Sequence, residues 1–141
     1  MNTKIIIIAG VVLGIVLVGS LVTKQKETPL SLDSQINSEG AVEVEVTPLE
    51  ISNASDLWQF KIVLNTHSVE LGQDLAAVVE LFDDKGNAYQ PLSWEGAPPG
   101  GHHREGVLSF RPLAPRPSSI VLVINNIGEV PERKFVWGVK K

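Results

Sequence analysis

The chain has 141 residues, with 12 Lys and Arg, 16 Asp and Glu, and a net charge of −4. Phosphate binding needs clustered Lys and Arg, and no basic block stands out, so nucleic acid is not expected as a partner. The chain has no cysteine, which excludes disulfides, thiolate zinc sites and a cysteine nucleophile.

An apolar segment at residues 5–22 follows the short N-terminal segment 1–4 and contains no charged residue. As a helix it would be roughly 27 Å long, near the hydrocarbon thickness of a bilayer. Signal-peptide cores are shorter, about 7–15 residues, and end in an Ala-x-Ala-like site, which Val18-Gly19-Ser20 matches poorly. We therefore predict one transmembrane helix that stays in place as a signal-anchor; a cleaved signal peptide is the alternative.

The rest of the chain lies on the C-terminal side of this predicted anchor. We expect a single-pass protein of the cell membrane whose C-terminal domain is extracytoplasmic. Residues 23–40 are polar and show no sustained period of 2 or 3.6, which is typical of a flexible linker. The folded domain is predicted at residues 41–141, a length that suffices for one hydrophobic core.

Alternation of apolar and polar residues predicts β-strands in this domain. In the clearest case Trp58, Phe60, Ile62 and Leu64 fall on one face of a strand. The other segments with strand patterns are residues 42–46, 107–110, 120–124 and 135–139.

Residues 75–82 fit two patterns, because their apolar positions also have helical spacing. The next residues, Asp83-Asp84-Lys85-Gly86-Asn87, are typical of a hairpin turn in which Gly86 adopts a positive φ. We therefore predict a strand at 76–82 that pairs with a strand at 88–92, and the helix remains the alternative.

Short strands separated by turn residues define the predicted fold class. About seven strands in about 100 residues indicate an all-β domain, namely a Greek-key immunoglobulin-like β-sandwich. A small β-barrel is the alternative, because periodicity does not separate the two architectures.

All three histidines lie in two short segments of the domain. His67 follows the clearest strand, and His102 and His103 lie in residues 94–110, a glycine- and proline-rich stretch that predicts a long irregular loop. Neutral imidazole suits Zn²⁺ and Cu²⁺, and three histidines with one open position are a known coordination set. The alternative is that these side chains pin the loop by hydrogen bonds, since His-His has little spacing specificity.

The same segments carry a resemblance to a known group of proteins. Residues Leu64-Asn65-Thr66-His67-Ser68-Val69 and Gly100-Gly101-His102-His103-Arg104, with the turn Asp84-Lys85-Gly86, resemble motifs of small membrane-anchored, extracytoplasmic immunoglobulin-like β-sandwich domains of bacteria. The resemblance covers about residues 58–137. It implies the fold and the location, and it implies no activity.

The sequence predicts a binding module more than a catalyst. No recognisable acid–base pair or nucleophile motif occurs, so no enzymatic activity is expected. The first hypothesis is an interaction module that is anchored through residues 5–22 and contacts a protein of the cell envelope. The alternative is a Zn or Cu binding protein that uses His67, His102 and His103.

Overall fold

The computed structural model describes residues 32–139 of the chain. The predicted anchor at 5–22 and the first part of the predicted linker therefore lie outside the described residues. Among residues 32–139 no helix is long and apolar enough to cross a membrane.

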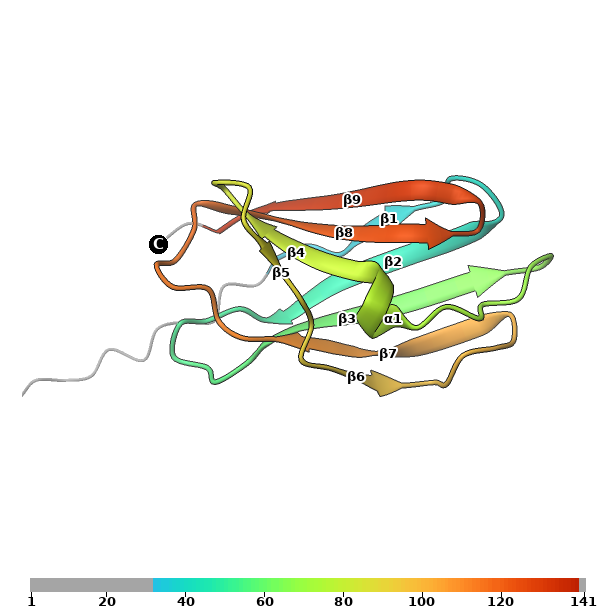
Figure 1. The fold of residues 1–141 in the computed structure, drawn as a ribbon, viewed down its shortest axis with the longest axis horizontal. Helices are drawn as coiled ribbons and strands as arrows, with labels where there is room; N and C mark the ends of the chain where they lie inside the picture. Colours follow the sequence, from blue (N-terminus) through green and yellow to red (C-terminus); the bar gives the residue numbers. More distant parts are fainter. Residues whose placement is uncertain (1–31, 140–141) are drawn as a thin grey trace, which may run out of the picture.

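The regular elements of the described residues are strands, apart from one short helix (Figure 1). Its elements are β1 (Gln35–Asn37), β2 (Val42–Glu50), β3 (Trp58–Thr66), α1 (Leu75–Val78), β4 (Val79–Asp83), β5 (Ala88–Tyr89), β6 (Ser93–Gly96), β7 (His103–Phe110), β8 (Ser119–Ile127) and β9 (Val130–Gly138).

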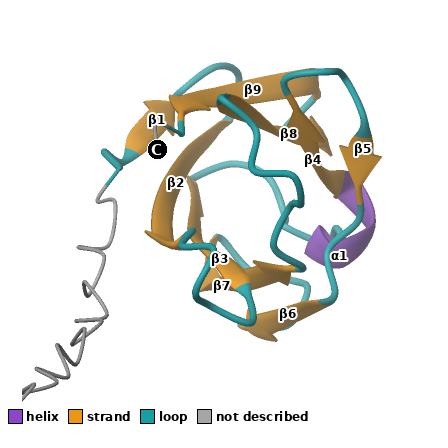
Figure 2. Ribbon diagram, turned by 90° about the vertical axis from the view of Figure 1, so that its left-hand side faces the viewer, coloured by secondary structure: helices purple, strands orange, loops and turns teal. Residues whose placement is uncertain are grey.

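The strands form two antiparallel sheets that face one another, as the end-on view of Figure 2 shows. The first sheet has five strands in the order β1-β2-β3-β7-β6, and the second has four in the order β5-β4-β8-β9. The prediction of an all-β domain is confirmed, and two facing antiparallel sheets are consistent with a β-sandwich.

The core lies between the sheets and follows the period of two along each strand. The predicted core positions on β3, Trp58, Phe60, Ile62 and Leu64, are all fully buried. Phe60 contacts the ring of Phe110 edge-on, with 5.8 Å between the ring centroids. The hydrophobic alternation therefore assigned the correct face to this strand.

The predicted boundary between linker and domain at residue 40 is wrong. β1 lies within the predicted linker and pairs with β2. The side-chain amide of Gln35 donates to the carbonyl oxygen of Val136 at 2.7 Å and accepts from its N–H at 3.2 Å. This side chain joins β1 to β9 of the second sheet, so the folded part begins before residue 41 (Figure 2).

The predicted strand at 76–82 is in part a helix. α1 occupies Leu75–Val78, and β4 begins only at Val79. Asp74 caps this turn, because its carboxylate accepts a hydrogen bond from the N–H of Ala76 at 3.0 Å. The helical spacing and the strand pattern were thus both correct, for successive parts of the segment.

The predicted hairpin between β4 and β5 is confirmed, with Gly86 at φ +83°. β5 ends at Tyr89, so it is shorter than the predicted 88–92. The carboxylate of Asp83 organises the turn. It accepts from the side-chain amide of Asn87 at 2.8 Å, from the N–H groups of Asn87 and Lys85 at 2.9 Å, and from the Tyr89 hydroxyl at 3.0 Å.

The hydrogen bond from the Asn87 side chain is the main cause that lowers the pKa of Asp83 to about 2. Because this pKa lies below the unfolded value of about 3.9, Asp83 stabilises the fold above about pH 4, and this contribution is lost as the pH falls through about 2. We expect Asp83→Asn to lower the free energy of unfolding at pH 7. The gap in this free energy between variant and wild type should close between about pH 4 and pH 2. Denaturant unfolding across this pH range measures the gap, and a constant gap would contradict the assignment.

Two opposite ends of the molecule differ in what they contain (Figure 1). At one end, which we call the terminal end, Trp137 Nε1 donates to the carbonyl oxygen of Asp33 at 2.8 Å, so the first and last described residues lie close together. At the other end lie the β1–β2 and β8–β9 turns with residues 67–74 and 97–102; we call it the loop end. Thr66 Oγ1 donates there to the carbonyl oxygen of Ala41 at 2.7 Å.

Candidate functional site

The stretch 94–110 is a β-hairpin, so the prediction of a long irregular loop is wrong. β6 and β7 pair in register from Ser93–Ser109 to Gly96–Gly106. Beyond the last pair, the N–H of Ala97 still bonds to the carbonyl oxygen of Glu105 at 3.0 Å. The connection is therefore reduced to residues 97–102 at the loop end.

Backbone hydrogen bonds join this connection to the segment after β3. The N–H of Leu71 bonds to the carbonyl oxygen of Gly101 at 3.0 Å, and the N–H of Gly100 bonds to the carbonyl oxygen of Leu71 at 2.8 Å. The N–H of Thr66 bonds to the carbonyl oxygen of His102 at 3.0 Å. Gly100 and Gly101 adopt φ values of +119° and +73°, which side-chain-bearing residues rarely adopt. The two segments 67–74 and 97–102 form one ordered surface, which we call the joined loops.

Arg104 lies beneath the joined loops and is only 1% exposed. Its guanidinium donates to the carbonyl oxygens of Leu71 at 3.1 Å, Gln73 at 2.6 Å and Ala97 at 3.3 Å. It also lies over the ring of Trp94, 5.8 Å from the ring centroid. Arg104 thus bonds to both loops at once. Burial lowers its pKa from the usual value for arginine.

Sequence reasoning missed Arg104 because strand β7 was predicted to begin at residue 107. The buried positions of β7 alternate backwards from Phe110 through Leu108 and Gly106 to Arg104. This period of two was present in the sequence, and following it for three more residues would have placed Arg104 on the inner face.

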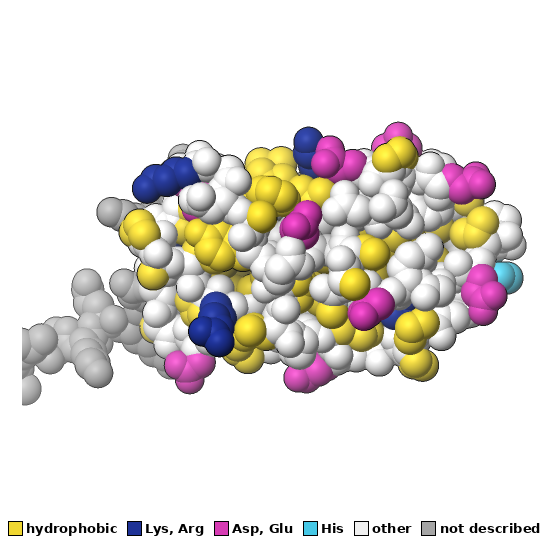
Figure 3. Space-filling view, in the orientation of Figure 1, with side chains coloured by type: hydrophobic (Ala, Val, Ile, Leu, Met, Phe, Trp, Pro, Cys, Tyr) yellow, Lys and Arg dark blue, Asp and Glu magenta, His cyan; other side chains and the backbone are white. Residues whose placement is uncertain are grey.

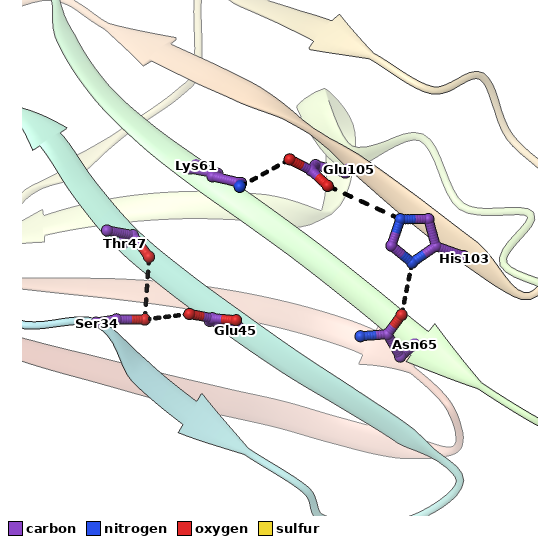
Figure 4. Close-up of polar contacts among 7 residues, drawn as sticks. All are labelled: Ser34, Glu45, Thr47, Lys61, Asn65, His103 and Glu105. Atoms are coloured by element: carbon purple, nitrogen blue, oxygen red, sulfur yellow. Dashed lines mark hydrogen bonds and ion pairs between the residues drawn. The ribbon is translucent and has the colours of Figure 1, made fainter.

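The three histidines lie at the loop end, and all three are exposed. His103 belongs to β7 and points to the outer face of the five-stranded sheet. Its Nδ1–H donates to Asn65 Oδ1 at 2.6 Å, and its Nε2 lies 3.8 Å from Glu105 Oε2 (Figure 4). His102 bonds to β3 through its backbone carbonyl and not through its ring. Within residues 32–139, His103 is the histidine with a side-chain hydrogen bond, and this bond joins β7 to β3 and not to the loop.

Glu105 lies between His103 and a second side chain of β3, Lys61. Lys61 Nζ lies 2.7 Å from Glu105 Oε1 (Figure 4), and this hydrogen bond lowers the pKa of Glu105 and raises that of Lys61. Both side chains are about half exposed, so solvent screens the pair and its effect on stability is small. The chain of contacts orients polar groups on an exposed face of the sheet.

Metal-ligating groups do not converge in the part of the chain that the structure describes. Between residues 32 and 139, no group of three or more His, Cys, Asp or Glu side chains is arranged to hold a metal ion. The assignment of His67, His102 and His103 to a Zn or Cu site stays a prediction.

Two glycines allow Trp94 to lie beneath the joined loops. A Cβ at Gly106 would lie 2.6 Å from the Cα of Gly96 and 2.7 Å from Trp94 Cζ2, so it would collide with backbone and indole. Trp94 Nε1 donates to the carbonyl oxygen of Ala97 at 3.0 Å, which holds the ring against the loop.

We expect Gly106→Ala to destabilise the domain by about 1–3 kcal/mol, the usual cost of overpacking. Denaturant unfolding of wild type and variant measures the loss. Gly138→Ala is the matched control, since a Cβ there meets no atom within 4 Å. Equal stability of the Gly106 variant and wild type would show that β6 and β7 separate more easily than their contact indicates.

Comparison with known proteins found no relative of this chain. No protein-family model, no curated protein and no solved structure matches it.

Proposed function

We propose that this chain is a membrane-anchored, extracytoplasmic binding module that contacts a protein of the cell envelope through its joined loops. The observation that carries the proposal is the separation of the two ends. The chain enters the domain at the terminal end, next to Trp137, and the joined loops lie at the opposite end. An anchor at residues 5–22 would therefore direct the joined loops away from the membrane.

The order of the strands supports an immunoglobulin-like Greek-key topology. Numbered from β2 as the first strand, the sheets β2-β3-β7-β6 and β5-β4-β8-β9 correspond to the orders A-B-E-D and C′-C-F-G. Domains of this kind use loops at one end of a rigid sandwich for recognition.

The chemistry of the joined loops also supports a binding role. Loops of this length usually contribute flexible backbone, and here Arg104 and the pairing of Leu71 with Gly100 and Gly101 hold them in one conformation. Binding to a preformed surface loses less conformational entropy than binding to a mobile one. The exposed side chains of Ser68, Glu70 and His102 offer polar contacts to a protein partner.

The absence of cysteine makes the location directly testable. In full-length chains, Ser68→Cys at the loop end introduces a single exposed thiol. We expect a membrane-impermeant maleimide to label this thiol in intact cells. Labelling only after permeabilisation would contradict the extracytoplasmic location.

Contact with a partner is tested by photo-crosslinking amino acids placed at exposed positions in the full-length chain. A crosslinker at Ser68 or His102 should capture an envelope protein. One at Asn53, which lies in the β2–β3 turn at the terminal end, should not capture the same protein. Equal capture from both ends would show that the joined loops are not the binding surface.

The Zn or Cu site at His67, His102 and His103 is the second hypothesis. Its support is the backbone geometry that places these residues at one end, with His103 opposite Asn65 and the carbonyl of His102 bonded to Thr66. If it is correct, Zn²⁺ or Cu²⁺ should raise the melting temperature of wild type at pH 7.5 and not that of His67→Ala. No metal-dependent shift in the wild type would remove this hypothesis.

A further inference from the structure

The outer face of the four-stranded sheet carries a continuous row of apolar side chains. Strand register places Ala88 opposite Phe82, Phe82 opposite Val121, and Val121 opposite Val136. The row therefore crosses all four strands, from β5 to β9. None of its members belongs to the hydrophobic core or packs against it.

Outward positions of a sheet that faces water are normally polar, so this row needs a reason. Val136 is 54% exposed and Ala88 is also exposed, whereas Phe82 and Val121 are half-buried. In Figure 3 hydrophobic side chains gather where Figure 1 draws β4 and β8. Contiguous exposed apolar surface on a small domain is typical of a protein–protein contact.

The neighbouring row of the same face is charged at two separated positions. Val123 lies opposite Glu80 on β4 and opposite Lys134 on β9. Gln90 Nε2 donates to Glu80 Oε1 at 2.8 Å and extends this row toward β5. Glu80 thus lies on one half of the sheet. Lys134 lies on the other half, where it also pairs with Glu132 of its own strand at 2.8 Å.

We propose that this face binds the same face of a second copy of the chain. A two-fold axis that runs along the strands, between β4 and β8, places Val136 over Ala88 of the second copy and Val121 over Phe82 of the second copy. The same rotation brings Lys134 next to Glu80 of the second copy. The face is therefore complementary to itself in both apolar surface and charge, as a symmetric dimer requires.

The orientation of the axis agrees with attachment to one membrane, and this part rests on the proposed function. A rotation about the strand direction keeps both terminal ends on the same side. Two anchored copies in one membrane would then meet without bending, and anchoring would raise their effective concentration. Both sets of joined loops would face away from the membrane, so the dimer would present two binding surfaces to its partner.

Crosslinking between two differently tagged full-length chains tests the dimer. One chain carries Val136→Cys and the other carries Ala88→Cys; both are expressed together and treated with a short, membrane-permeant bifunctional maleimide. We expect a crosslinked pair with unlike tags. Pairs with like tags should be rare, because the two copies of either position lie three strand spacings apart sideways, about 14 Å, in addition to the gap between the sheets.

Charge reversal in the same pair of chains tests the register. Lys134→Glu in both chains should lower the crosslinked fraction by roughly five-fold, since two charge pairs become repulsive. Adding Glu80→Lys should restore the fraction. The control chain Glu43→Cys, with its thiol on the outer face of the other sheet, should not be crosslinked to Val136→Cys.

The absence of an unlike-tag product, or an equal product with Glu43→Cys, would overturn the dimer. A failure of Glu80→Lys to restore crosslinking would overturn the proposed axis. Labelling of Ser68→Cys from outside separates these results from the proposed function. If Ser68→Cys is labelled in intact cells and no unlike-tag pair forms, the location stands and the dimer is wrong. If Ser68→Cys is labelled only after permeabilisation, the crosslinker, which crosses the membrane, still decides the dimer.

Discussion

Ile62→Asp is expected to unfold the β-sandwich. Ile62 has no exposed surface and lies at the centre of β3, between Val46 of β2 and Gly106 of β7. A buried carboxylate without a partner costs several kcal/mol, in addition to the loss of apolar packing. The total rivals the whole stability of a domain of this size, about 5–15 kcal/mol.

Circular dichroism and thermal melting of residues 32–141 measure this effect. Ile36→Asp is the matched control, because Ile36 belongs to the same sheet and is 62% exposed. We expect the control to melt close to the wild-type temperature and Ile62→Asp to show no cooperative transition. A cooperative melt of Ile62→Asp near the wild-type temperature would contradict the assignment of the inner face.

Arg104→Ala is expected to release the joined loops, with the second-largest effect. The substitution removes a charged donor from the carbonyl oxygens of Leu71, Gln73 and Ala97. The oxygens of Leu71 and Ala97 keep the hydrogen bonds from Gly100 N–H and Trp94 Nε1, so the Gln73 oxygen is the most affected. Hydrogen bonds to charged groups contribute about 1.5–3 kcal/mol each, and part of this is recovered when water enters the opened loops. We therefore expect a loss of about 3 kcal/mol, with faster amide exchange at Leu71 and Gly100.

Two variants distinguish Arg104 from its surroundings. Arg104→Lys keeps the charge but has a single ammonium in place of the guanidinium fork, so it should retain only part of the stability. His102→Ala should lie within about 0.5 kcal/mol of wild type, because His102 is exposed and bonds through its backbone. If His102→Ala cost as much as Arg104→Ala, the histidine ring would be the pin and Arg104 would not.

The joined loops and the outer face of the four-stranded sheet have different proposed roles. In the two proposals, the loop end binds an envelope partner through polar, preorganised groups, and the outer face of the four-stranded sheet binds a second copy through an apolar row. Because the two surfaces do not overlap, substitutions at Val136 should leave partner capture from His102 measurable. The two proposals are therefore separable by experiment.

The strands were predictable where one face of the strand is buried and the other faces water. Trp58, Phe60, Ile62 and Leu64 alternate with residues of the outer face, and burial in the sandwich requires that alternation. The turn at Gly86 was predictable for a local reason, since its backbone needs a positive φ and the neighbouring Asp and Asn side chains satisfy the turn. Both signals act over a few residues, so a sequence contains them.

Other features depend on segments that are distant in the chain. The polar sequence of β1 contains no strand period. β1 is a strand because its backbone pairs with β2, and its Gln35 side chain bonds to β9, 101 residues later. The stretch 94–110 looks irregular because it contains four glycines and two adjacent prolines. Yet Gly96 and Gly106 are the residues that let β6 and β7 approach beneath Trp94. Composition does not show which backbone segment a glycine will pack against in the fold.

The sequence alone predicted the all-β domain that residues 32–139 form, and it shows an apolar N-terminal segment and the histidines in two motifs. Only the tertiary structure decided that those histidines are exposed and that Arg104 holds the two motifs together. The reason is physical: a side chain's role depends on whether its hydrogen-bond partners are water or buried carbonyl groups. For Arg104 these partners are Leu71, Gln73 and Ala97, which the pairing of β3, β6 and β7 brings within reach.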